Sequence, residues 1–266
     1  TKGRSMDETS ENTHDMVKRP LRVLFMHGLE SGTKGRKARY LSMHYETVIP
    51  DMKVSVRSWT RPNSLLRNIV RDSTFRLFAG SMALTLPCAY AAFGTTVTYC
   101  AFSTYVVLLA FAAPNLLRRA GAVTIHSCLA VQREALQREK PDVVVGSSLG
   151  GAIALLCILE GAWSGPTVLL APALGAITRR LVPLFPNYEQ MARSLPKSVA
   201  DSVVIMHGDK DATCPLADSQ VLHDIWGARL EVVPGGDHRL NDGALKSGHL
   251  VELISEVTVD VPGSGA

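Results

Sequence analysis

The hexapeptide Gly146-Ser147-Ser148-Leu149-Gly150-Gly151 lies between two apolar runs. Valines occupy positions 143–145 before it and apolar residues occupy 152–156 after it, so a buried strand and a helix are predicted on its two sides. A tight turn between a strand and a helix lifts a serine out of the sheet, and flanking glycines let the backbone pass closely. Ser148 is therefore a candidate nucleophile. The alternative is a glycine- and serine-rich connection without chemistry.

The rest of the chain alternates between strand and helix patterns. Strands are predicted at 21–26, 52–56, 143–145, 167–170, 202–206 and 230–233, and helices at 37–45, 124–140, 149–160, 216–225 and 245–256. This alternation predicts an α/β fold, with a doubly wound, mostly parallel sheet and helices on both faces.

Four polar or glycine-containing segments follow the ends of predicted strands. They are His27-Gly28, the Ser148 turn, His207-Gly208 and Pro234-Gly235-Gly236. Ligands of such sheets bind beyond the carboxyl ends of the strands. The four segments are therefore expected to meet at one edge of the sheet, around Ser148.

Composition describes one globular domain without a disulfide framework. The chain has 266 residues, 46% of them hydrophobic and 20% charged, with a net charge of +4 that is spread along the sequence. No basic patch indicates nucleic-acid binding. The five cysteines are odd in number and form no CxxC pair, which predicts reduced thiols and neither disulfides nor a zinc site.

Residues 77–117 do not fit an ordinary soluble domain, because they carry no charged side chain. One membrane pass needs about 20 apolar residues, so the segment is long enough for two passes with a turn near Gly94. The predicted strands before and after the segment must join one sheet, so the chain has to leave and return on the same side of a membrane, which requires an even number of passes. Arginines 67, 71 and 76 precede the segment and 118 and 119 follow it, as expected when both ends face the same side of a membrane.

Two other interpretations of this hairpin stay open. It could be a buried cap or a subunit contact, or an amphipathic pair lying in the membrane interface, although it has no strong polar face. Membrane insertion is the favoured interpretation. The predicted organisation is a flexible N-terminal arm (1–18), an α/β domain (19–76 and 118–258), the inserted hairpin (77–117) and a flexible tail (259–266).

A nucleophilic serine needs a base and an acid that orients the base. Asp209 and Asp211 follow the predicted strand 202–206 and are the acid candidates. The base candidates are His223, His238 and His249, of which His238 alone directly follows a strand; the other two lie in predicted helices.

These motifs resemble the α/β-hydrolase superfamily, and in particular its small serine esterases and thioesterases. The resemblance covers about residues 21–256 outside the hairpin and rests on four segments: Phe25-Met26-His27-Gly28, Gly146-Ser147-Ser148-Leu149-Gly150, His207-Gly208-Asp209-Lys210-Asp211 with Cys214-Pro215, and Gly236-Asp237-His238. It implies Ser148 as nucleophile, His238 as base and Asp211 as acid, with Asp209 as the alternative acid. It also implies an oxyanion hole formed by the backbone N–H groups of Leu29 and Leu149, a structural role for His27, and no cofactor or metal.

The sequence departs from the family in two places. Cys214 stands where a valine is usual, and the large insertion precedes the helix that leads into the serine turn instead of forming the usual cap. The insertion is therefore expected to serve attachment. The basic segment 30–39 is interpreted as a solvated helix start, with contact to a substrate anion or a lipid headgroup as the alternative.

The resulting expectation is a membrane-associated serine hydrolase that cleaves carboxylic esters or thioesters, including those of lipids, through an acyl-enzyme. The alternative is a hydrolase-fold accessory subunit of a membrane protein complex. Reduced cysteines, and a chain that begins at Thr1 where a transit peptide could have been removed, are compatible with an intracellular membrane such as the mitochondrial inner membrane.

Overall fold

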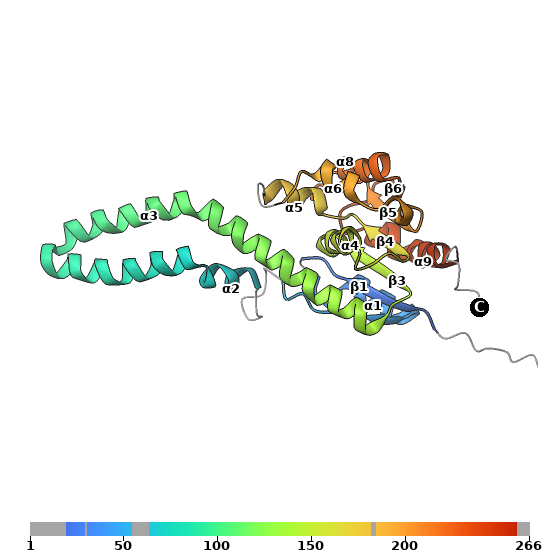
Figure 1. Cartoon of the computed structure of the whole chain (residues 1–266), viewed down its shortest axis with the longest axis horizontal. Helices are drawn as coiled ribbons and strands as arrows, with labels where there is room; N and C mark the ends of the chain where they lie inside the picture. Colours follow the sequence, from blue (N-terminus) through green and yellow to red (C-terminus); the bar gives the residue numbers. More distant parts are fainter. Residues whose placement is uncertain (1–19, 30, 55–63, 182–184, 260–266) are drawn as a thin grey trace, which may run out of the picture.

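The computed structural model describes residues 20–29, 31–54, 64–181 and 185–259. The predicted N-terminal arm at 1–18 and positions 55–56 and 260–266 of the predicted elements lie outside these residues. The described chain forms a sheet covered by helices on both faces, from which a long helical hairpin projects (Figure 1).

The sheet confirms the predicted α/β class. Its strands are β1 (Arg22–Met26), β2 (Glu46–Val48), β3 (Val143–Ser147), β4 (Thr167–Leu170), β5 (Val203–Gly208) and β6 (Arg229–Val233). They are arranged in the order β2-β1-β3-β4-β5-β6, and every pair is parallel. The direction in which strands are added reverses between β1 and β3, whose registers pair Met26 with Gly146. Such a reversal opens a crevice beyond the strand ends.

Two apolar cores fill the space between the sheet and its helices. One core contains α4 (Leu149–Leu159), the second half of α3 (Ser73–Glu139), and the helices α5 (Leu174–Arg180), α6 (Tyr188–Ser194), α7 (Lys197–Ala200) and α8 (Leu216–Val221) with the π-helical turn η1 (Leu222–Trp226). The other contains α1 (Arg36–His44), the π-helical turn η2 (Asn241–Lys246) and α9 (His249–Val259). Valines 143–145 of β3 are fully buried, as expected for a central parallel strand.

Three predicted element bounds are wrong. The second strand is Glu46–Val48 rather than 52–56, and Met52 and Val54 are buried in an irregular segment, which explains their alternating pattern. The predicted helix 216–225 is divided into α8 and η1. The last helix begins at His249 rather than at 245, because η2 ends at Lys246 and Gly248, with φ 78°, separates it from α9.

The apolar segment forms a helical hairpin. Gly94, with φ 77° and ψ −167°, breaks α3 into two arms, a backbone conformation that suits glycine. The arms lie side by side: the Phe78 and Tyr105 rings are 5.2 Å apart, and the Thr85 and Tyr105 hydroxyls are 2.8 Å apart. Figure 1 shows the hairpin, together with the short helix α2 (Ser64–Arg71) that leads into it, extending well beyond the α/β domain.

The second arm does not end where the apolar segment ends. It continues as one helix to Glu139, so the separately predicted helix at 124–140 is its docked half. From Leu116 onward one face of this helix is buried, and from Ile125 onward this face is part of the core of the domain, including Leu129 and Leu136. No proline occurs in α3 after Pro114, which is consistent with this continuity. The hairpin is thus held by a helix that belongs to the core.

In the described part of the chain, α3 is the helix that is long and apolar enough to cross a membrane, and only 6% of its most apolar window is buried inside the protein.

Candidate active site

The Ser148 turn is strained and tightly held. Ser148 has φ 55° and ψ −114°, a conformation that a residue with a side chain adopts only when its surroundings enforce it. Its N–H donates to the Leu170 carbonyl at 2.9 Å, and its carbonyl accepts from the Ala152 and Ala173 N–H groups at 3.1 and 3.0 Å. The end of β4 and the residues just after it therefore hold the turn in place, with the serine at the edge of the sheet.

Glycines allow this turn to pack against β1. A Cβ on Gly150 would lie 1.8 Å from the Met26 carbonyl oxygen, and one on Gly146 would lie 2.8 Å from the Gly151 Cα. Real Cβ atoms do not approach backbone this closely. Gly146 and Gly150 therefore permit α4 to sit directly beside β1 and the loop that follows it.

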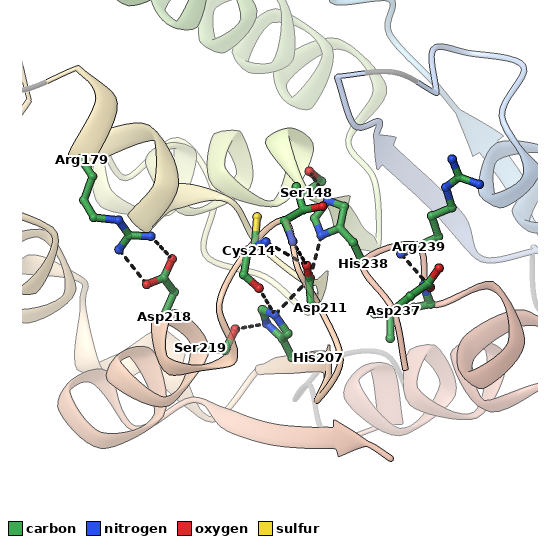
Figure 2. A network of polar contacts seen from close by, with 12 residues as sticks. Ser148, Arg179, His207, Asp211, Cys214, Asp218, Ser219, Asp237, His238 and Arg239 are labelled. Atoms are coloured by element: carbon green, nitrogen blue, oxygen red, sulfur yellow. Dashed lines mark hydrogen bonds and ion pairs between the residues drawn. The ribbon is translucent and has the colours of Figure 1, made fainter. Parts of the chain in front are cut away.

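Three predicted residues come together at this edge. The Ser148 Oγ lies 2.9 Å from the His238 Nε2, and the His238 Nδ1 lies 2.7 Å from the Asp211 Oδ2 (Figure 2). They come from the carboxyl ends of β3, β5 and β6. With its proton on Nδ1, His238 donates to the carboxylate and accepts from the serine hydroxyl, which is the arrangement that general-base activation of a serine requires.

Both carboxylate oxygens of Asp211 have polar partners. Its side chain is fully buried, and its Oδ1 accepts from the N–H groups of Thr213 and Cys214 at 2.7 and 2.8 Å. His207, also buried, lies 3.3 Å from Oδ2, and its own ring bonds the Cys214 carbonyl and the Ser219 hydroxyl. These contacts orient the carboxylate toward His238.

Sequence reasoning missed the bracing role of His207. In the sequence, only its position at the start of the His207-Gly208 motif pointed to His207, and no motif pointed to Ser219.

The other candidates lie elsewhere. Asp209 accepts from the Gly235 N–H at 2.7 Å and braces the loop that carries His238. His223 bonds the Ala228 carbonyl, and His249 contacts Glu252 and Glu231, which raise its pKa. His27 is buried and accepts from the Met52 N–H at 3.2 Å, so it shapes the first loop.

The two residues whose backbone N–H groups are predicted to form the oxyanion hole lie in the segments next to the serine. Leu149 opens α4 directly after Ser148, and Leu29 follows Gly28, where an added Cβ would lie 3.5 Å from the Ser148 Cβ. Within the described residues, neither N–H has a hydrogen-bond partner. The Ser31 hydroxyl accepts from the Gly28 N–H at 3.2 Å and holds this loop.

Burial changes the acidity of two groups near the site. Desolvation raises the pKa of the Cys214 thiol to about 12, so this buried cysteine is a neutral packing residue. Desolvation also lowers the pKa of Lys37 to about 8, with Asp237 opposing the shift and Arg239 adding to it. Lys37 is half-buried, while Lys34, Arg36 and Arg39 of the basic segment are exposed.

A cavity of about 490 Å³ lies at the opposite edge of the sheet, near the starts of β4 and β5, and contains no residue of the Ser148 group. The described residues contain no group of three histidine, cysteine or carboxylate side chains that could hold a metal ion.

The chain is similar to several solved structures. TT1662 from Thermus thermophilus matches 91% of this chain and 90% of its own length, at 14% identity and a TM-score of 0.54. A protein from Xanthomonas campestris pv. campestris, described as a hydrolase of the alpha/beta superfamily, matches 90% of this chain and 98% of its own length, at 19% identity and a TM-score of 0.43. A meta-cleavage product hydrolase, CumD, matches 92% of this chain and 93% of its own length, at 15% identity and a TM-score of 0.48.

No protein-family model matches the sequence. No curated protein matches it significantly. The parallel sheet, the serine turn between β3 and α4 and the similarity to TT1662 together define an α/β-hydrolase fold with an apolar helical hairpin inserted before β3.

Proposed function

We propose that this protein is a membrane-anchored serine hydrolase that cleaves carboxylic ester or thioester bonds. The observation that carries the proposal is the continuous hydrogen-bonded series Asp211–His238–Ser148 at three strand ends. Fold alone does not determine chemistry, so the proposal rests on these three side chains and on the strained turn that presents one of them.

The mechanism follows from the geometry. The Ser148 Oγ attacks the carbonyl carbon while the His238 Nε2 accepts its proton, and Asp211 stabilises the imidazolium that forms. The oxyanion accepts from the N–H groups of Leu29 and Leu149. His238 then protonates the leaving alcohol or thiol, which leaves an acyl-enzyme. Water, deprotonated by His238, releases the acid and restores the Ser148 hydroxyl.

The membrane part of the proposal rests on the hairpin surface. Leu84, Phe93, Tyr99 and Phe111 are each at least 71% exposed, in a segment without charge. Such a continuous apolar surface is rarely left in water. The arms from residue 77 to 93 and from 95 to 117 are about 25 and 35 Å long, which suits a hydrocarbon layer of about 30 Å.

Three threonine hydroxyl groups in the hairpin are satisfied within their own helices. Thr85, Thr98 and Thr104 each donate at 2.9 Å to the carbonyl four residues earlier, and the Thr98 bond serves Gly94, where the helix is broken. Polar groups need such internal partners in lipid, because no water is available there.

The activity is tested with p-nitrophenyl esters of graded chain length on protein in detergent. The wild type and Ser147→Ala are expected to hydrolyse at least one ester, and Ser148→Ala is expected to lose that hydrolysis to background. Equal rates for Ser148→Ala and Ser147→Ala would overturn the proposal. Alkaline carbonate extraction tests anchoring: the protein should stay in the membrane pellet, and release into the supernatant would contradict insertion.

A second candidate is an accessory subunit whose hairpin packs on other membrane proteins. The same exposed apolar surface supports it, since the bilayer and protein helices present similar surfaces to it. Stable insertion of the purified chain into lipid vesicles favours the bilayer, whereas aggregation that only a membrane-protein partner relieves favours the subunit.

A further inference from the structure

The hairpin leaves the domain at the same edge of the sheet that carries the Ser148 group. The docked half of α3 leads directly into β3, and as a crossover helix it runs antiparallel to the strands. Its beginning, from which the hairpin extends, is therefore at the carboxyl ends of the strands. Figure 1 shows this arrangement: the hairpin projects from one end of the sheet, and the end of α9 lies at the other.

Helix α5 connects the serine to the base of the hairpin. Just before α5, the Ala173 N–H bonds the Ser148 carbonyl at 3.0 Å. Just after α5, a Leu181 methyl group lies 2.8 Å from where a Cβ of Gly121 would be, so this residue packs on α3 four positions beyond the apolar segment. The distance along α5 between these contacts is about 12 Å.

The connection is apolar near the serine. Ala173, Ala176 and Cys214 form a small, buried apolar cluster, and the partly exposed Ile177 packs against it. The pKa of the Cys214 thiol is raised, so the cluster carries no charge there. An acyl chain reaching Ser148 from the hairpin base would pass Ile177 and meet no charge from this cluster.

Positive charge surrounds the hairpin base. Residues 64–120 contain five arginines and a single acidic residue, Asp72. Arg67, Arg71, Arg76 and Arg118 are exposed, and so is Arg180 at the end of α5. Juxtamembrane arginines attract anionic lipid headgroups. This charge favours a position in which the base of the hairpin, and with it the Ser148 edge, faces the headgroup layer.

We infer that the Ser148 site faces the bilayer and takes its substrate from it, so that the substrate is an acyl ester of a membrane lipid. The inference rests on the proposed function and adds direction to it: the acyl chain of the lipid extends along α5 toward the hairpin base with its ester at Ser148, while the arginines at the base contact anionic headgroups of the surrounding bilayer. Water-soluble esters need no such orientation.

Three proteins test the orientation. The first is the wild type. The second has residues 79–113 replaced by a short Gly-Ser turn, which keeps the contacts of Arg119 with Asp72 and Thr74 at the hairpin base. The third adds to this shortened protein a single transmembrane helix after Val259, joined by a short linker, so that it is anchored from the opposite edge of the sheet. Each is assayed on soluble p-nitrophenyl butyrate and on a fluorogenic phospholipid in vesicles that contain anionic lipid.

All three proteins are expected to hydrolyse the soluble ester at similar rates. The wild type should hydrolyse the vesicle lipid at least about 100-fold faster than the shortened protein, because anchoring raises the effective concentration of lipid. The reverse-anchored protein should bind vesicles as well as the wild type does but hydrolyse the lipid no faster than the shortened protein.

Equal lipid hydrolysis by the wild type and the reverse-anchored protein would overturn the orientation and leave the proposed function intact. Hydrolysis of the soluble ester alone, with no lipid turnover by the wild type, would also overturn it. Absence of all Ser148-dependent hydrolysis would instead defeat the proposed function, so the two failures are distinguishable.

Discussion

At the scale of single residues, the structure separates two aspartates that the sequence left as alternatives. Asp211 contacts His238 and has a fully buried side chain, whereas Asp209 bonds the Gly235 N–H and is exposed. The two positions are two residues apart in one loop. Their roles differ because β5 ends at Gly208 and the loop then turns Asp211 inward.

The pair Asp211→Asn and Asp209→Asn tests this assignment. An asparagine at 211 can keep the Oδ1 bonds to Thr213 and Cys214, but its amide nitrogen would donate to the His238 Nδ1. The imidazole would then carry its proton on Nε2 and could not accept one from Ser148. We expect kcat to fall about 10³- to 10⁴-fold for Asp211→Asn and by less than about tenfold for Asp209→Asn. The reverse order in ester hydrolysis would make Asp209 the acid.

The turn glycines give a prediction about stability. Gly150→Ala places a Cβ 1.8 Å from the Met26 carbonyl oxygen, so α4 must move away from β1. Overpacking of this kind costs about 1–3 kcal/mol or more, and we expect the melting temperature in detergent to fall by about 5 °C or more. The control is Gly80→Ala, where a Cβ meets nothing within 4 Å, and its melting temperature should stay the same or rise. Equal effects of the two variants would contradict the close packing.

Lys37 gives a prediction about pH. Its pKa is lowered from 10.5 to about 8 by burial, so between these values the unfolded chain binds more protons at this residue than the folded protein does. The contribution of Lys37 to the free energy of unfolding therefore rises with pH across that window. We expect the melting temperature of the wild type, relative to Lys37→Met, to increase from about pH 8 to about pH 10. A difference that is constant over this range would show that Lys37 titrates normally.

At the scale of elements, the hairpin is one helix with the core helix that follows it. No flexible connection separates the exposed second arm from the buried face that begins at Leu116. The orientation of the domain relative to the hairpin is therefore determined by helix packing, including the contact between Gly121 and Leu181.

Native cysteines report where the hairpin lies. Cys88 and Cys100 are exposed on it, whereas Cys128, Cys157 and Cys214 are buried in the domain, where burial raises their pKa values to about 12. In detergent under native conditions, we expect a small maleimide that partitions into the detergent micelle to modify Cys88 and Cys100. With protein in lipid vesicles, a charged, membrane-impermeant maleimide should modify none of the five cysteines.

Modification of Cys88 or Cys100 by the charged reagent in vesicles would place the hairpin in water and contradict membrane insertion. Dissolving the same vesicles in sodium dodecyl sulfate is the control, because it removes the bilayer, unfolds the domain and should expose all five thiols to the reagent.

At the scale of the whole molecule, the sequence predicted more of the site than of the insertion. The Ser148 turn, Asp211 and His238 follow strand ends, and in a parallel sheet strand ends meet, so local pattern was sufficient to bring them together. The second strand was misplaced because Met52 and Val54 are buried without belonging to the sheet. Burial produces the same alternation whether or not a strand is present.

The direction of the hairpin could not be read from the sequence. Hydropathy identified an apolar segment with a break near Gly94, but it could not show that the second arm continues to Glu139 or packs beside α5. That information depends on contacts such as Gly121 with Leu181, between residues far apart in the chain. The edge of the sheet from which the hairpin departs is therefore a structural result.

The activation of Ser148 by His238 as a nucleophile can be measured with a serine-reactive fluorophosphonate probe on vesicle-inserted protein, followed by mass-spectrometric mapping of the adduct. We predict a single adduct on Ser148 in the wild type and in Ser147→Ala, and none in Ser148→Ala, with labelling strongly slowed in His238→Ala. Absence of an adduct in wild-type protein shown to be folded, or an adduct that persists in Ser148→Ala, would contradict it.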